Sequence, residues 1–201
     1  YLLALPDEGV PVVFLIRQLG KSVNTVVLDN EGGAYEATRY MLSRGLRNIA
    51  LINGGLDLPL YRHRYEGYRR ALREAGVNEP DKLVIHGISG WDDGYQTMKE
   101  ILDAGLRPDA VFATSDPKAM GIIRAIRDAG LQVPQDISVM GFDNIDFSNQ
   151  IDPPLTTVAQ PFYEMGVRAC RRLIHLIESG RSGRSKVEVL PAQLVIRKSV
   201  I

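Results

Sequence analysis

The sequence predicts an α/β fold in which parallel sheets are flanked by helices. Two observations support this prediction. Short runs rich in β-branched and other aliphatic residues alternate with longer stretches whose apolar residues recur every three or four positions. Glycine followed by an aliphatic residue ends four of the longer stretches at intervals of about 30 residues, which is the length of one strand-plus-helix unit. Successive units of this kind form a parallel sheet covered by helices.

The expected strands are distributed along most of the chain. We predict them at 12–16, 25–28, 49–52, 83–85, 110–113 and 139–142, with two more at 187–190 and 193–196. The helices between them each have one apolar face, as in the sets Ala34, Ala37 and Met41; Ala119, Ile122 and Ile126; and Met165, Ala169, Leu173 and Leu176. Each of these faces is expected to be buried.

Helix ends are marked by residues with a conformational reason to be there. The glycines that end four helices are expected to adopt the left-handed conformation because they lack a Cβ atom: Gly45, Gly76, Gly105 and Gly130. At the opposite end, Pro117 suits the first turn of a helix, and Ser115 or Asp116 is expected to cap the free N–H groups there. A second proline, Pro161, opens the last long helix in the same way.

Composition limits the classes of protein to consider. The 201 residues contain 24 Lys and Arg against 24 Asp and Glu, so these residues offer no basic excess with which to bind nucleic acid. The single cysteine, Cys170, excludes an intrachain disulfide and favours the cytoplasm. We expect it to be a buried, inert thiol, because it lies within the last amphipathic helix. The apolar N-terminal stretch is too short for a membrane helix, and the chain is expected to begin inside a longer polypeptide because it lacks an initiator Met.

Polar residues follow several expected strands, where ligands bind in open α/β sheets. They are Asp29-Asn30, Asn53-Gly54-Gly55, Ser115-Asp116 and Asp143-Asn144. Arg64 is expected to join them from the start of a helix. Groups of both charges with fixed orientation suit the binding of a polyhydroxylated or otherwise polar small molecule. The set therefore indicates binding and not a reaction.

Motifs of enzymes and metal sites are missing from the sequence. It contains no nucleophile elbow, no phosphate-binding loop and no zinc-protease motif, and its three histidines are spread over separate elements. We therefore predict no catalytic residue, no metal and no cofactor. An α/β enzyme with Asp116 or Asp143 as base remains an alternative, but it lacks a nucleophile or cofactor loop.

Three strings in order resemble the effector-binding domain of the lactose/galactose repressor (LacI/GalR) family: residues 113–121, 130–143 and 154–161. With Asp29-Asn30, Gly33 and residues 64–68, the resemblance covers nearly the whole chain. It implies a two-lobed fold of the periplasmic binding protein-like type I, with two Rossmann-like lobes. The N-terminal lobe, at 1–45 and 160–190, is expected to be incomplete, and the C-terminal lobe spans 46–159 and 191–201.

The family's members are cytoplasmic transcription regulators, so the resemblance implies a function and partners. We expect a sugar or sugar derivative as effector, a homodimer, no membrane partner, and operator DNA bound only through an upstream helix-turn-helix that these residues lack. A sugar-binding protein of an ABC-type importer, which shares the fold, is the alternative. Met120 and Ile151 correspond to dimer-interface residues, although isolated surface or core packing also explains them.

The resemblance also assigns ligand-binding residues. Arg64 corresponds to an arginine that binds the ligand, with a surface ion pair as the alternative, and Asp143 to an aspartate that accepts sugar hydroxyls, with a simple turn as the alternative. Trp91 corresponds to an aromatic residue that stacks on the ligand, or else packs at a helix start.

Four further ligand contacts are expected. Ser115 stands where many relatives have asparagine. Asp29 is expected either to face the cleft or to form a capping turn. Gln160 is expected to bind a ligand hydroxyl and Phe162 to line the pocket. The alternative is that both residues serve the start of a helix, which needs polar and apolar neighbours.

Overall fold

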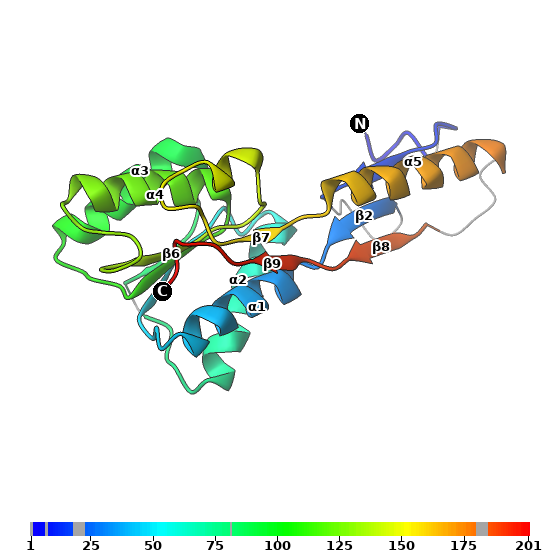
Figure 1. Cartoon of the computed structure of the whole chain (residues 1–201). Coiled ribbons are helices and arrows are strands. Elements are labelled where there is room, and N and C mark those ends of the chain that lie inside the picture. Colours follow the sequence, from blue (N-terminus) through cyan, green and yellow to red (C-terminus); the bar gives the residue numbers. More distant parts are fainter. Residues whose placement is uncertain (1, 7, 18–22, 81, 180–184) are drawn as a thin grey trace. The chain divides into compact units, whose positions relative to one another are not determined.

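The computed structural model describes residues 2–6, 8–17, 23–80, 82–179 and 185–201, and several of its elements are labelled in Figure 1. The chain forms two compact units. The smaller unit comprises Tyr1–Asp29 and Gln160–Ala192, and the larger unit comprises Asn30–Ala159 and Gln193–Ile201.

The larger unit is built on a parallel four-stranded sheet with the order β4-β3-β5-β6. Its strands are β3 (Ile49–Ile52), β4 (Val84–Ile85), β5 (Ala110–Ala113) and β6 (Ser138–Met140). Its helices are α1 (Asn30–Ser43), α2 (Pro59–Glu74), α3 (Gly90–Asp103) and α4 (Asp116–Asp128). Every residue of β3 and β5 is buried, as expected for central strands covered on both faces.

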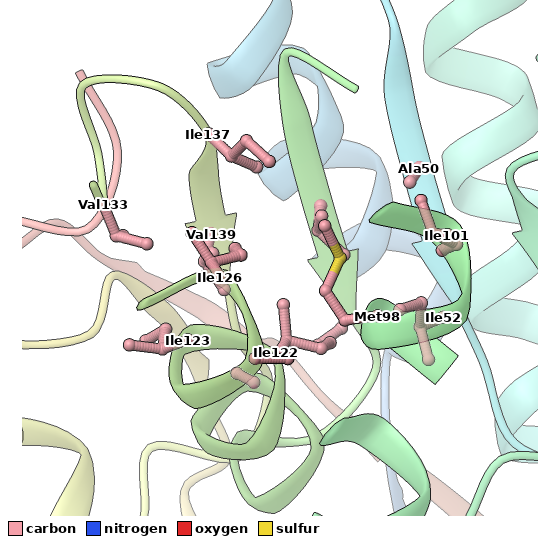
Figure 2. Close-up of a cluster of buried hydrophobic side chains, with 14 of the residues drawn as sticks. Ala50, Ile52, Met98, Ile101, Ile122, Ile123, Ile126, Val133, Ile137 and Val139 are labelled. Atoms are coloured by element: carbon pink, nitrogen blue, oxygen red, sulfur yellow. The ribbon is translucent and has the colours of Figure 1, made fainter. Parts of the chain in front are cut away.

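One part of the core of the larger unit lies between this sheet and helices α3 and α4. Figure 2 shows part of it, with Met98 of α3 and Ile122 and Ile126 of α4 beside the strand residues Ile52 and Val139. All five side chains are completely removed from solvent. Burial of such aliphatic side chains contributes about 1.5–3 kcal/mol each, so this cluster fixes the two helices on the sheet.

Glycines allow helices to pack with their backbones in contact. A Cβ atom at Gly67 of α2 would lie 2.8 Å from the backbone nitrogen of Tyr35 in α1, and closer still to the carbonyl of Glu31. Gly121 of α4 meets the backbone of α3 in the same way, at the carbonyl of Trp91. No other residue fits at these two positions without separating the helices.

A short antiparallel sheet joins β7 (Thr157–Ala159) to β9 (Gln193–Val195). A single 3₁₀ turn, η1 (Asp146–Asn149), precedes it. The end of the chain is tied to the main sheet, because Ser199 Oγ donates to the carbonyl of Val139 at 2.6 Å and accepts from the N–H of Thr156 at 2.8 Å. These bonds hold the segment that follows β6 in place.

The smaller unit has a parallel sheet with the order β1-β2-β8, formed by β1 (Val13–Leu15), β2 (Asn24–Leu28) and β8 (Val187–Leu190). Helix α5 (Phe162–Glu178) packs against it. Met165 and Ala169 of α5 form a small core with Val26 and Leu190.

The structure confirms parallel sheets flanked by helices, and every expected strand is present to within two residues of its expected ends. The four glycines at helix ends have φ between +65° and +86°, as predicted. The first boundary between the two units falls at Asp29/Asn30, whereas the resemblance placed it after residue 45. Helix α1 accounts for the difference, because it packs along α2 and so belongs to the larger unit.

Two predictions about single residues are wrong. Neither Ser115 nor Asp116 caps α4 through its side chain, because the carboxylate of Asp116 is bound instead to Thr157 and to the N–H of Ile145. Cys170 is exposed, not buried. It follows Ala169 on α5, and a step of one residue turns the side chain about 100° away from the buried stripe.

Candidate functional site

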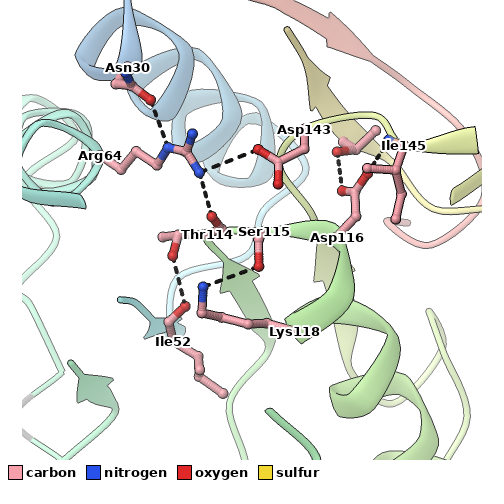
Figure 3. Close-up of polar contacts among 10 residues, drawn as sticks. Asn30, Ile52, Arg64, Thr114, Ser115, Asp116, Lys118, Asp143 and Ile145 are labelled. Atoms are coloured by element: carbon pink, nitrogen blue, oxygen red, sulfur yellow. Dashed lines mark hydrogen bonds and ion pairs between the residues drawn. The ribbon is translucent and has the colours of Figure 1, made fainter. Parts of the chain in front are cut away.

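The carboxyl ends of β3, β5 and β6 bring polar residues from distant parts of the sequence to one edge of the larger unit's sheet. Asn53 follows β3, Thr114 and Ser115 follow β5, and Asp143 lies three residues after β6. Helices α2 and α4 begin near this edge and contribute Arg64 and Lys118. Figure 3 shows the polar contacts of Arg64, Ser115, Lys118 and Asp143.

Arg64 is the centre of the group and is only 3% exposed. Its Nε donates to Asn30 Oδ1 at 2.8 Å, and its Nη1 donates to the carbonyl of Thr114 at 2.5 Å and lies 3.6 Å from Asp143 Oδ1 (Figure 3). The guanidinium also lies 3.6 Å from the ring centroid of Phe142. Burial lowers the pKa of Arg64 to about 10, so it stays charged at neutral pH. Arg64 is therefore not part of a surface ion pair, and it lies in the second turn of α2, not at its start.

Asp143 has a strained backbone. Its φ is +117° and that of the following Asn144 is +56°, in a region that residues with a Cβ rarely adopt. The N–H of Asp143 donates to the carbonyl of Val158 at 2.8 Å, and Asn144 Oδ1 accepts from Arg197 at 2.7 Å. These contacts hold the Asp143 carboxylate near Arg64, with 19% of the side chain still exposed.

Asp116 holds the loop that carries Asp143. Its Oδ1 accepts from Thr157 Oγ1 at 2.5 Å and its Oδ2 accepts from the N–H of Ile145 at 2.9 Å. Burial raises the pKa of Asp116 to about 6, although these hydrogen bonds favour the ionised form. Both oxygens are engaged in fixing the loop, which favours a structural role over that of a general base.

Lys118 also belongs to this group, although it was not predicted from the sequence. It is 1% exposed, and its Nζ donates to Ser115 Oγ at 3.1 Å and lies 4.7 Å from the ring centroid of Tyr61. Burial, and then the nearby charge of Arg64, lower its pKa to about 8. The signal was present in the sequence, because Lys118 precedes Ile122 by four residues and so lies on the apolar stripe of α4.

Asn53 is completely buried after β3. Its Nδ2 donates to the carbonyl of Tyr61 at 3.1 Å and lies 3.1 Å from Nδ1 of His86. Its Oδ1 is buried without a hydrogen-bond partner among the residues that the structure describes. Because Nδ2 is a donor, Nδ1 of His86 must accept, and burial lowers the pKa of His86, so the imidazole is neutral.

Comparisons with known proteins decide the family. The model of the periplasmic binding protein-like domain matches residues 38–200. The chain is 41% identical over 168 residues to the HTH-type transcriptional repressor PurR of Pasteurella multocida, covering 84% of this chain and 50% of that protein. This chain belongs to the LacI/GalR family.

Further relatives agree with the LacI/GalR assignment. The chain is 41% identical over 155 residues to the ribose operon repressor of Escherichia coli K12, covering 77% of this chain and 47% of that protein. The solved structure of a complex of the transcriptional regulator CelR with cellobiose has a TM-score of 0.90 and 37% identity, covering 97% of this chain and 60% of that one. The chain thus spans about half the length of the curated relatives it matches.

Residues assigned through the LacI/GalR resemblance fall into separate groups. Arg64, Asp143 and Ser115 come together at the sheet edge, as described above. Trp91 is 42% exposed, stacks on Tyr95 with 5.7 Å between ring centroids, and lines a surface cavity of about 300 Å³ together with Met120 and Ile151. Trp91 therefore lies beside the two residues expected in the dimer interface.

The other three expected ligand contacts belong to the smaller unit. Asp29 is exposed directly before α1, and its N–H donates to the carbonyl of Leu190 at 2.8 Å. The carbonyl of Gln160 accepts from the N–H of Phe162 at 2.9 Å at the start of α5. The Phe162 side chain is half exposed.

Across residues 2–6, 8–17, 23–80, 82–179 and 185–201, no group of three His, Cys, Asp or Glu side chains is arranged to hold a metal ion. In the same residues, no helix has the length and apolar composition needed to cross a bilayer.

Proposed function

We propose that this chain is the effector-binding and dimerisation region of a bacterial LacI/GalR-type transcription regulator. In this proposal the larger unit binds a small polar effector, a sugar or a related molecule, through Arg64 and Asp143. Operator DNA is bound by a part of the regulator outside these residues, and the protein acts in the cytoplasm. The relatives named above are repressors or regulators of transcription, which favours this function over that of an importer's binding protein.

The observation that carries the proposal is the buried pairing of Arg64 with a strained Asp143. A guanidinium fixed by Asn30 and Thr114 presents N–H donors, and the neighbouring carboxylate presents acceptors. Adjacent sugar hydroxyls both donate and accept, so such a pair binds them in one orientation. Phe142 packs against the guanidinium and limits its movement.

The remaining assigned residues extend the proposal. From the resemblance we include Ser115, Asp29, Gln160 and Phe162 among the ligand contacts. Trp91 is also kept as a ligand contact from the resemblance, and its position beside Met120 brings it close to the expected subunit contact.

Ligand binding is tested with the longest form of the protein that its gene encodes. A thermal-shift screen with pentoses, hexoses, their phosphates and purines identifies a ligand, since a ligand that binds only the folded state raises the melting temperature. Asp143→Asn, which keeps the size of the side chain, is expected to weaken binding of that ligand at least tenfold. The matched control is Asp128→Asn on the exposed face of α4, which is expected to leave binding unchanged. Unchanged affinity in Asp143→Asn, or a folded protein that binds no member of the panel, contradicts the proposal.

Dimerisation through the surface around Met120 is tested separately. Ile151→Asp places a charge among the apolar residues there and is expected to yield monomers in sedimentation velocity. The control is Ile177→Asp on the exposed face of α5, which is expected to leave the oligomeric state as it was. A monomeric wild-type protein, or a dimer that persists in Ile151→Asp, contradicts this part.

A further inference from the structure

We propose that Lys118 binds the effector directly and selects one that carries an anionic oxygen group, either a carboxylate or a phosphate. The inference rests on the proposed function, since it concerns the same group of residues. It adds a chemical class of ligand, because sugars without such a group give a buried ammonium no counter-charge.

The first argument is that Lys118 is buried without a carboxylate partner. Of its three N–H donors, one is bound to Ser115 Oγ, and the ammonium also faces the ring of Tyr61. Within the residues that the structure describes, no Asp or Glu oxygen lies within 4.0 Å of its Nζ. Lysine is almost never this deeply buried unless it is paired.

The second argument is the balance of charge in the group. Arg64 and Lys118 are both buried cations, and the charge of each disfavours the other. Asp143 is the acidic side chain closest to Arg64, and it offsets only one positive charge. Asp116 is mostly ionised at pH 7, since its pKa is about 6, but its two oxygens accept hydrogen bonds from Thr157 and from the N–H of Ile145. Asp143 is thus the carboxylate that Arg64 and Lys118 share, and an anionic ligand would supply a second counter-charge.

The third argument is that Arg64 and Lys118 both face the same aromatic ring. The ring centroid of Tyr61 lies 5.7 Å from Cζ of Arg64 and 4.7 Å from Nζ of Lys118. This ring is fixed against Gly54, where a Cβ atom would overlap it. An effector that reaches Arg64 and Asp143 through its hydroxyls thus has Lys118 at the same end of the sheet, next to Ser115 (Figure 3).

A purely structural role for Lys118 makes different predictions. In that case Ser115 and Tyr61 satisfy the ammonium, and an apolar side chain of similar size in its place leaves the choice of ligand unchanged. Lys118→Met provides that side chain. Lys118→Arg keeps the charge and shows whether charge alone suffices.

The experiment measures affinities for ligand pairs that differ by one acidic group, using isothermal titration calorimetry on the longest form of the protein. The probes are glucose, glucose 6-phosphate and glucuronate, and ribose with ribose 5-phosphate. The wild-type protein is expected to bind the anionic member of one pair at least tenfold more tightly than the neutral member. Lys118→Met is expected to lose that preference, because it lowers the affinity for the anionic member at least tenfold more than the affinity for the neutral sugar. Comparing glucose 6-phosphate with glucuronate distinguishes a preference for phosphate from a preference for carboxylate.

The outcomes separate this inference from the proposed function. If a neutral sugar binds as tightly as its acidic partners and binding is lost in Asp143→Asn, the proposed function stands and the inference about Lys118 is overturned. The inference is also overturned if Lys118→Met keeps the wild-type affinity for the anionic ligands and unfolds in a thermal transition as sharp as that of the wild type. If the folded wild-type protein binds none of these probes, the inference about Lys118 is overturned, and if it binds no member of the thermal-shift panel either, the proposed function fails as well. If Lys118→Met does not fold, Lys118→Gln replaces it, with the same losses expected.

Discussion

The close contact between α3 and α4 gives a sharp prediction for Gly121→Ala. A Cβ atom at position 121 would lie 2.8 Å from the backbone nitrogen of Tyr95, and closer still to the carbonyl of Trp91. Ordinary van der Waals contact begins at 3.4 Å, and the neighbouring atoms are backbone, which cannot rotate away. The two helices must therefore separate by roughly 1 Å, as overpacked cores do when no side chain can adjust.

The magnitude follows from two opposing terms. Alanine is favoured over glycine inside a helix by about 1 kcal/mol. Overpacking of this kind typically costs about 1–3 kcal/mol and sometimes more, and here it also loosens Met98 and Ile122, which pack between the helices and the sheet. Because two backbone atoms lie within 3.0 Å of the new Cβ atom, the overpacking cost is expected at the upper end of that range, so Gly121→Ala should lower the free energy of unfolding by about 2 kcal/mol.

Gly166→Ala is the matched control, because Gly166 is also inside a helix, α5, but has open space where the new methyl group would lie. Without a clash only the helix term remains, so this variant is expected to raise stability by up to about 1 kcal/mol. Urea unfolding followed by circular dichroism measures both changes. If Gly121→Ala unfolds at the same urea concentration as the wild type or at a higher one, the argument from backbone contact is refuted.

Three further predictions concern buried polar groups. Lys118→Met is expected to raise stability at pH 7 by up to about 3 kcal/mol, because the folded pKa of about 8 lies below the usual 10.5; the gain should fade as pH rises from 8 to 10.5 in urea titrations. Asp116 has a folded pKa of about 6, above its usual 3.8, so the free energy of unfolding of the wild type is expected to fall relative to that of Asp116→Asn as pH rises from 4 to 6, although the amide cannot accept both of the carboxylate's hydrogen bonds. Tyr68→Phe removes the donor to the buried carbonyl of Ile49, at 2.8 Å, and is expected to cost about 1 kcal/mol in the same urea assay at any pH from 5 to 9.

Much of the fold could be predicted from local sequence. Strands β3 and β5 have the predicted ends, because short aliphatic runs bounded by polar residues are what a central parallel strand requires. Strand β7 was not predicted, since its three residues become a strand only by pairing with β9, more than 30 positions along the chain. The pairing of distant segments leaves no periodicity in a single sequence.

The candidate site was predicted in part. Arg64 and Asp143 were found because polar residues after parallel strands converge at one sheet edge, and because the family resemblance assigned them. Lys118 was not predicted because the apolar stripe of α4 was expected to begin at Ala119, and a lysine side chain is usually exposed to solvent. The closeness of Trp91 to Met120 and Ile151 was not predicted, because only the packing of α3 against α4 in three dimensions shows it.

The strained loop after β6 is better explained by binding than by stability. Positive φ values at two residues with side chains, Asp143 and Asn144, cost on the order of 1–3 kcal/mol each. Bonds from Arg197 to Asn144 and from Ile145 to Asp116 keep the loop in that conformation. The loop therefore holds the Asp143 carboxylate beside Arg64 through its own contacts. A carboxylate already held in place loses little freedom on binding, and a glycine at 143 would relieve the strain but remove the acceptor.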